Sequence, residues 1–176
     1  KATANSAGSN AVTNGYGGIV YAVRTKARVI NCSWGGTVSA TSDQAVINYA
    51  WSKGVIVIVS AGNNGNTVMG YPAAYTNAYS VVCSNSSDVK SGFSTYGTWC
   101  DITAPGDPLY STVPNTSYGN MSGTSMASPL VAGLAGLMLS RNGYLPPTQV
   151  LNCISTTAAN IYTISGNSAY AGQLGA

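Results

Sequence analysis

The sequence predicts an α/β fold: a parallel β-sheet with helices on both faces. Helix-like and strand-like patterns alternate between Gly15 and Ser60, which is typical of parallel strands joined by helical crossovers. Residues 55–60 are five apolar residues and a serine, so they indicate a strand buried on both faces. The apolar stretch 125–141 predicts a helix in the interior of the fold.

A lead-in, a helix and a short strand come before the apolar strand. Residues 1–14 are small and polar, which predicts a loop or an extended lead-in. Apolar residues at helical spacing indicate a helix over residues 15–27. The β-branched residues of segment 28–33 then indicate a short strand that ends at Gly35-Gly36.

A second helix is predicted to begin at Thr41, because Thr41 and Gln44 have the spacing of a capping box. Gly54 is expected to follow its end as the C′ residue. The side chains expected to face inward are those of Ala45, Val46, Tyr49 and Ala50.

The second half of the chain supplies further strands and a last helix. Residues 79–83 and 100–104 predict a third and a fourth strand, the latter stopped by Pro105-Gly106. Residues 109–113 predict a short fifth strand. After the apolar helix, Pro146-Pro147 is expected to begin a final helix that reaches Thr157.

The composition excludes several classes of protein. Charged residues form only 6% of the chain, against about 25% in an ordinary soluble domain. This excludes a charge-driven disordered tail and a nucleic-acid binder with a basic stripe. No segment reaches about 18 consecutive apolar residues, so no membrane span is predicted. The chain has no histidine, which excludes any mechanism that takes an imidazole from this chain alone.

The cysteines and one sequon give weaker signals. The four cysteines lack CxxC spacing, which argues against a structural zinc site and leaves both disulfides and buried free thiols open. Asn31 begins an Asn-x-Ser sequon, but its place on a predicted buried strand argues against glycosylation.

Ser125 is predicted to lie at the start of the apolar helix, directly after a glycine turn. The N–H groups of a helix N-terminus point outward and stabilise negative charge, so a nucleophile there gains a donor for an oxyanion. Pro129 is compatible with this interpretation because the first helical turn needs no N–H from it. Taken alone, the segment favours the simpler alternative that Ser125 caps the helix.

A second candidate segment follows the most apolar strand, at residues 59–65. Parallel sheets bind ligands outside the carboxyl ends of their strands. Glycine there would let a substrate backbone approach closely, and the amide of Asn63 would supply a neutral donor. Taken alone, this segment favours a plain Asn-Asn-Gly turn.

Together the two segments resemble the subtilisin-like serine proteases, the subtilases. The run SGTSMASPLVAG at 122–133 is similar to the nucleophile signature of that family, and VIVSAGNNG at 57–65 to its oxyanion-hole strand. VINCSWGG at 29–36 resembles the substrate-binding strand, and GYPAAY at 70–75 the segment under the specificity pocket. FSTYGTWCDITAPG and AGQLGA resemble the approach to the nucleophile and the end of the domain.

The resemblance implies a three-layer subtilisin-like fold whose N-terminal strands are missing, so that residues 1–176 form the C-terminal part of one peptidase domain. It implies that Ser125 is the nucleophile and that Asn63, with the Ser125 N–H, forms the oxyanion hole. The residues implied to bind an extended substrate are Ser33, Trp34 and Gly35. The residues implied to form the specificity pocket are Ser60, Ala61 and Gly62 in its wall and Gly70 at its floor.

The same resemblance shows where this chain departs from the family. Leu130 stands where the family usually has the histidine of SPHVAG, and Ser122 stands where many members have Asn. Cys83 and Cys100 are the pair best placed for a disulfide if the family's strand order holds. Calcium stabilises many subtilases, but its usual site is built from upstream residues, so no metal ligand is assigned here.

The triad of the family runs Asp, His, Ser along the chain, so its first two members should precede Lys1. Without an imidazole nothing takes the serine proton, and this chain alone is predicted to be essentially inactive. The implied partners are a peptide or protein substrate and a complementary N-terminal segment that carries Asp and His, in a secreted enzyme. Two alternatives stay open: an inactive module that binds extended peptides, and a structural domain of a larger surface protein.

Overall fold

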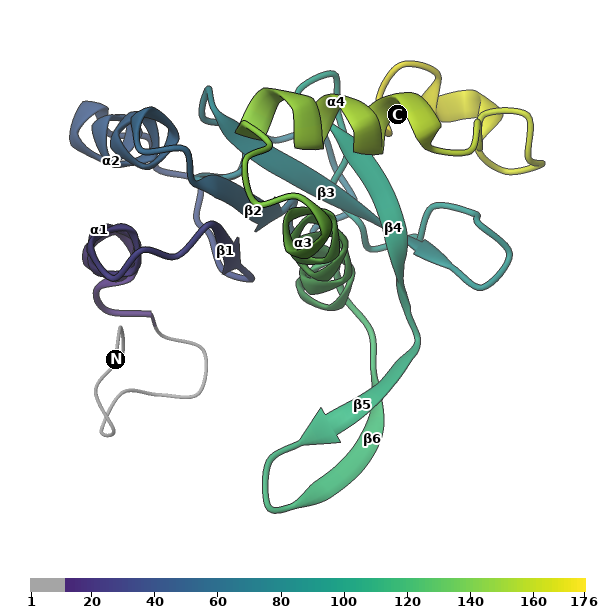
Figure 1. Cartoon of the computed structure of the whole chain (residues 1–176). Helices are drawn as coiled ribbons and strands as arrows, with labels where there is room; N and C mark the ends of the chain where they lie inside the picture. The colour runs from purple at the N-terminus through teal and green to yellow at the C-terminus, as the bar shows by residue number, and fades with distance from the viewer. Residues whose placement is uncertain (1–11) are drawn as a thin grey trace.

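A four-stranded parallel sheet forms the centre of the computed structural model, which describes residues 12–176 (Figure 1). Its order is β1-β2-β3-β4, and each neighbouring pair is parallel. The strands are β1 (Val29–Cys32), β2 (Ile56–Ser60), β3 (Ala78–Asn85) and β4 (Ile102–Asp107). The predicted parallel sheet is therefore confirmed.

Helices cover both faces of this sheet (Figure 1). One face carries α1 (Gly15–Arg24) and α2 (Thr41–Ser52), and the other carries α3 (Thr124–Arg141) and α4 (Pro147–Thr157). Successive residues of β2 enter the two layers in turn, with Val57 toward α1 and α2, and Ile58 toward α3 and α4. All five residues of β2 are buried, which confirms the strand predicted to be buried on both faces.

The start of α2 differs from the prediction. Ala40 is the N-cap and Thr41 is already helical, so the predicted capping box does not form. Gln44 instead bonds the backbone of Thr76, accepting from its N–H at 3.1 Å and donating to its carbonyl at 2.9 Å. The tertiary contact offers the Gln44 amide two partners, whereas a capping box would use one.

The rest of α2 follows the prediction in part. Gly54 lies after the last turn with φ +73°, as expected of a C′ residue. The fully buried residues of the helix are Ile47 and Ala50, while the predicted inward residue Ala45 is exposed. The helix therefore faces the sheet along a line that includes Ile47 in place of Ala45.

β4 continues past the predicted stop at Ala104, through Pro105 and Gly106. Because β4 is an edge strand, Pro105 need not donate a ladder hydrogen bond. The register with β3 shifts just after this point. β5 (Leu109–Val113) and β6 (Ser117–Met121) follow as a separate antiparallel hairpin that projects away from the sheet (Figure 1).

The apolar helix α3 is enclosed on one side only within residues 12–176. Its sheet-facing residues Ala127, Val131 and Ala135 are buried, but Leu130, Leu134 and Leu137 are 45%, 46% and 70% exposed. The prediction of an interior helix thus holds for half of its surface. Because α3 is apolar on all sides, its sequence does not indicate which face packs on the sheet.

The cysteines are all free thiols, so the expected Cys83–Cys100 bridge is absent. Cys83 lies opposite Ala104 in the β3–β4 ladder, whereas Cys100 precedes β4, and the two thiols enter different apolar clusters. No helix in the described part of the chain is long and apolar enough to cross a membrane.

We predict that a thiol reagent at pH 8 modifies one cysteine per native chain and all four after unfolding. Cys153 is exposed, whereas burial raises the pKa of Cys32 and of Cys100 to about 12 and keeps both as unreactive thiols. The Cys153→Ser variant should show no fast-reacting thiol. Rapid native modification of a second cysteine would contradict this packing.

Candidate active site

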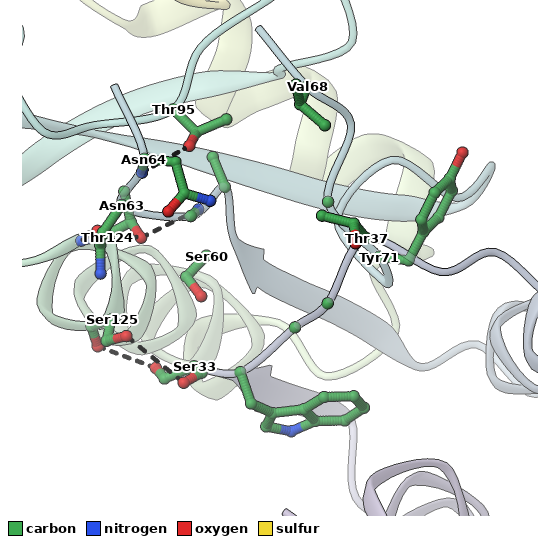
Figure 2. A pocket seen from close by; sticks show the side chains of 16 residues that line it. Ser33, Thr37, Ser60, Asn63, Asn64, Val68, Tyr71, Thr95, Thr124 and Ser125 are labelled. Atoms are coloured by element: carbon green, nitrogen blue, oxygen red, sulfur yellow. Dashed lines mark hydrogen bonds between the residues drawn. The ribbon is translucent and has the colours of Figure 1, made fainter. Parts of the chain in front are cut away.

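A cavity of about 240 Å³ opens where β1 and β2 end and α3 begins (Figure 2). It is bordered by all nine residues that the sequence singled out: Ser33, Trp34, Gly35, Ser60, Ala61, Gly62, Asn63, Gly70 and Ser125. Its remaining walls come from Gly36, Thr37, Asn64, Val68, Tyr71, Thr95 and Thr124. Segments nearly 100 positions apart in the sequence therefore meet in one place.

The sheet explains why these segments meet. Cys32 and Val59 are paired at the ends of two parallel strands, so the residues that follow them leave the sheet at the same edge. The α3 N-terminus is attached to the end of β4, because the N–H of Gly123 donates to the Gly106 carbonyl at 3.0 Å. These connections bring the first turn of α3 against the ends of β1 and β2.

Ser125 is the second residue of α3 and does not cap it. The N-cap is Gly123, which has no side chain that could bond the helix end. The Ser125 hydroxyl donates to the carbonyl of Ser33 at 3.4 Å. The N–H of a second helical residue has no acceptor within the helix and points out of its end. Ser125 thus presents a half-buried hydroxyl and a backbone donor at the positive end of the helix.

Thr124 orients the Asn63 amide. Both the N–H and the hydroxyl of Thr124 donate to Oδ1 of Asn63, each at 2.9 Å. With Oδ1 occupied, Nδ2 faces the other way. A β-carbon built on Gly123 would lie 3.4 Å from this Nδ2 and 3.7 Å from the backbone N of Ser125. The two nitrogen donors therefore border one small space, which the glycine leaves open.

The segment after β1 is shaped to expose its backbone to the cavity. Gly36 and Tyr71 form an antiparallel bridge. The Gly36 N lies 2.9 Å from the Tyr71 carbonyl oxygen, and the Tyr71 N lies 2.7 Å from the Gly36 carbonyl oxygen. A β-carbon on Gly35 would lie 2.9 Å from the Tyr71 carbonyl, so only glycine fits this close approach. Trp34 is held by an edge-on contact with Tyr16, at 5.3 Å between ring centroids.

Small residues line the wall and the floor beyond this segment. Ala61 is buried, and a β-carbon on Gly70 would lie 3.3 Å from the Ala61 carbonyl. Gly62 has φ +113°, a conformation that favours glycine, and its N–H donates to Oγ1 of Thr124 at 3.2 Å. The wall is therefore tied to the same threonine that orients Asn63.

Sequence reasoning missed two threonines that shape the site. Thr124 bonds both Asn63 and Gly62. Thr95 donates its N–H to the Gly62 carbonyl at 2.9 Å and accepts from the Asn64 N–H at 3.1 Å. Thr124 lies beside Ser125 in the sequence, but its partners lie about 60 residues away, and no local pattern marks such contacts.

The cavity offers neutral donors and no proton acceptor of the kind that catalysis uses. Its lining, within the described part of the chain, includes no Asp, Glu, Lys or Arg side chain, and the sequence has no His. Nor do residues 12–176 hold any group of three or more His, Cys, Asp or Glu side chains that could bind a metal ion. The arrangement can position a hydroxyl and offer neutral hydrogen-bond donors to an oxyanion.

Known proteins are similar to this chain in sequence and in fold. The sequence model of the Subtilase family matches residues 1–175. The chain is 49% identical to thermitase of Thermoactinomyces vulgaris, over 78% of this chain and 49% of that protein. It is 38% identical to subtilisin DY of Bacillus licheniformis, over 96% of this chain and 62% of that protein. The chain thus spans about half the length of these relatives.

Solved structures agree with the sequence matches. A cold adapted subtilisin-like serine proteinase superposes with a TM-score of 0.82 at 29% identity, covering 92% of this chain and 59% of that chain. The maturation protease PagA superposes with a TM-score of 0.81 at 28% identity, covering 88% of this chain and 61% of that chain.

We predict that Asn63→Leu lowers the free energy of unfolding by about 1–3 kcal/mol, because the buried Thr124 then loses the acceptor for its N–H and its hydroxyl. Asn63→Asp keeps an acceptor oxygen and should retain most of the stability. Asn64→Leu, the same change at the exposed neighbouring position, is the matched control, and we expect it to cost less than about 0.5 kcal/mol.

Urea unfolding of the three variants measures these differences. Equal losses for Asn63→Leu and Asn64→Leu would show that the two hydrogen bonds from Thr124 do not stabilise the fold.

Proposed function

The chain belongs to the subtilase family, and on that premise we propose that it is the C-terminal part of a subtilisin-like serine endopeptidase. Two observations support this most directly. Nδ2 of Asn63 and the backbone N of Ser125 lie 3.4 and 3.7 Å from the point where a β-carbon on Gly123 would stand, and Asn63 and Ser125 line the same cavity. A hydroxyl next to two convergent neutral donors is the arrangement that acyl transfer requires.

In the proposed reaction, Oγ of Ser125 attacks the carbonyl carbon of a peptide bond and gives up its proton to an external base. The carbonyl oxygen becomes an oxyanion, which accepts from Nδ2 of Asn63 and the N–H of Ser125. The C–N bond then breaks, the base returns its proton to the leaving amine, and an ester to Ser125 remains. Water hydrolyses this ester by the same steps.

The base belongs, in this proposal, to a complementary N-terminal segment that carries the Asp and the His of the family. Two observations support such a segment. The described cavity has no base of its own, and α3 leaves Leu130, Leu134 and Leu137 exposed on the helix that carries Ser125. Apolar side chains spaced along one helix face are normally covered by another element.

The proposed substrate is an extended peptide. The backbone of residues 33–35 borders the cavity, where it can pair with a substrate strand and set its register. The small side chains of Ala61, Gly62 and Gly70 leave room for a bulky apolar residue before the cut. An uncharged, polar composition and the family together support secretion of the enzyme.

No metal has a part in this proposal. Calcium takes about six to eight oxygen ligands, most of them from carboxylates and carbonyls. Residues 12–176 contain no group of three or more His, Cys, Asp or Glu side chains, so we assign no metal ligand among them. No step is assigned to calcium on this chain.

The lack of a base within the chain favours one rival, an inactive module that binds extended peptides in the same groove. The two functions differ in the fate of Ser125. A peptidase acylates this serine, whereas a binding module holds peptides without any reaction of its hydroxyl.

We predict that a fluorophosphonate labels Ser125 when the chain is co-expressed with an upstream segment that carries Asp and His. Asn63→Leu should slow labelling about 10²–10³-fold, a magnitude measured for the equivalent donor in subtilisin itself and carried over here. Ser125→Ala should remove labelling, and the chain alone should label at a negligible rate. Mass spectrometry of the labelled peptide identifies the site.

Saturable peptide binding without labelling, in the presence of that segment, would establish the rival function. A gene that encodes no Asp and His segment before Lys1 would refute the peptidase proposal.

We predict that Gly70→Val changes the preferred residue before the cut from bulky to small. The new side chain starts 3.3 Å from the Ala61 carbonyl and occupies the floor of the cavity. The ratio of kcat/KM for peptides with Phe and with Ala at that position measures the change. An unchanged ratio would place the specificity pocket elsewhere.

A further inference from the structure

The carbonyl of Ser125 lacks its ordinary donor in α3. In an α-helix each carbonyl accepts from the N–H four residues later, and for Ser125 that residue is Pro129. Proline has no N–H. Pro129 lies inside α3, well past the N-cap Gly123, so the expectation that the first turn needs no N–H from it is wrong. That expectation placed Ser125 at the start of the helix and Pro129 in its first turn, whereas α3 begins at Thr124 and Pro129 lies beyond that turn.

A side chain from β1's end replaces the missing donor. The Ser33 hydroxyl donates to the Ser125 carbonyl at 2.9 Å. The Asn31 amide in turn donates to Oγ of Ser33 at 2.9 Å, and Oγ of Ser128 donates to Oδ1 of Asn31 at 2.6 Å. In this series of three hydrogen bonds, the hydroxyls of Ser33 and Ser128 each donate their proton to one acceptor. The hydrogen bonds therefore run from α3 to β1 and back to α3, at the carbonyl that Pro129 leaves open.

The burial of these residues differs along the network. Ser128 has no exposed surface, and its hydroxyl must find an acceptor inside the structure. Asn31 is exposed, contrary to the prediction of a buried position, because β1 is the edge strand of this sheet. Both ends of the Asn31 amide are nevertheless engaged.

Ser33 contacts the nucleophile twice. Its hydroxyl donates to the Ser125 carbonyl, and its own carbonyl accepts from the Ser125 hydroxyl at 3.4 Å (Figure 2). On the other side of Ser125, Thr124 is bonded to Asn63. Thr124 and the carbonyl of Ser125 are thus attached to residues that follow different strands, Asn63 beyond β2 and Ser33 beyond β1.

We propose that Asn31, Ser33 and Ser128 are positioning residues that replace the hydrogen bond removed by Pro129 and so hold the Ser125 hydroxyl in place for acylation. The network orients the peptide group that follows Ser125, while the bonds between Thr124 and Asn63 hold the residue before it. This inference rests on the proposed function, since it assigns the network to the reaction of Ser125.

The test combines loss of the Ser33 hydroxyl with return of the N–H at position 129. In the complex with the Asp and His segment, Ser33→Ala should slow fluorophosphonate labelling of Ser125 about tenfold, as expected for one lost hydrogen bond. The affinity for a substrate peptide should stay unchanged, because Ser33 would pair with substrate through its backbone. Ser33→Thr, which keeps a hydroxyl, should restore most of the rate.

The double variant separates positioning from general damage. Pro129→Ala supplies an N–H to the Ser125 carbonyl, so in that background Ser33→Ala should slow labelling less than about twofold. Ser140→Ala is the matched control, because it removes a hydroxyl from the same helix that only bonds the Leu137 carbonyl. Thermal unfolding of each variant shows whether a change in labelling rate comes from loss of stability. If Ser33→Ala fails to fold, Asn31→Ala at an exposed position replaces it in the test.

A second measurement needs no activity. In the wild-type chain alone, the carbonyl ¹³C shift of Ser125 reports its hydrogen bond. Ser33→Ala should move it upfield, and adding Pro129→Ala should move it back. Absence of labelling in the wild-type complex would sink the proposed function, and the carbonyl shift would still show whether Ser33 replaces the missing donor. Wild-type labelling in Ser33→Ala, or an equal loss in both backgrounds, would overturn the positioning role.

Discussion

The first turn of α3 is held between the ends of two neighbouring strands, and the geometry of the candidate site depends on this attachment. Asn63, beyond β2, accepts two hydrogen bonds from Thr124, and Ser33, beyond β1, donates to the carbonyl of Ser125. Because β1 and β2 are parallel, both attachments lie at the same edge of the sheet. A shift of the helix N-terminus relative to the sheet would break at least one of them.

The sheet beneath this attachment is a rigid support. β2 is buried along its whole length and sends alternate residues into two separate apolar layers, so neither face can move without repacking a core. Rigid support matters for oxyanion stabilisation, since donors that are already in place need no reorganisation when charge develops. The neutral character of the cavity fits the same requirement, because no described charge competes with those donors.

The proposed N-terminal segment would explain two features of the described part of the chain. The cavity has a hydroxyl and two donors without a base, and the helix that carries the hydroxyl has one covered and one exposed apolar face. A segment that packed on Leu130, Leu134 and Leu137 would cover that face. Because the proposed base is carried by the same segment, one polypeptide would supply the base and cover the exposed face of α3.

The sequence by itself determined the elements and the residue types of the site. Continuous apolarity predicted β2, glycine predicted the end of α2, and the long run around Ser125 predicted both α3 and the family, because these signals lie within a few neighbouring residues. Only the tertiary structure decided how Gln44 is bonded, which face of α3 is covered, and how Pro129 is accommodated. Each of these depends on partners outside the local segment, such as Thr76 for Gln44 and Ser33 for Ser125, and such partners leave no mark on the local pattern.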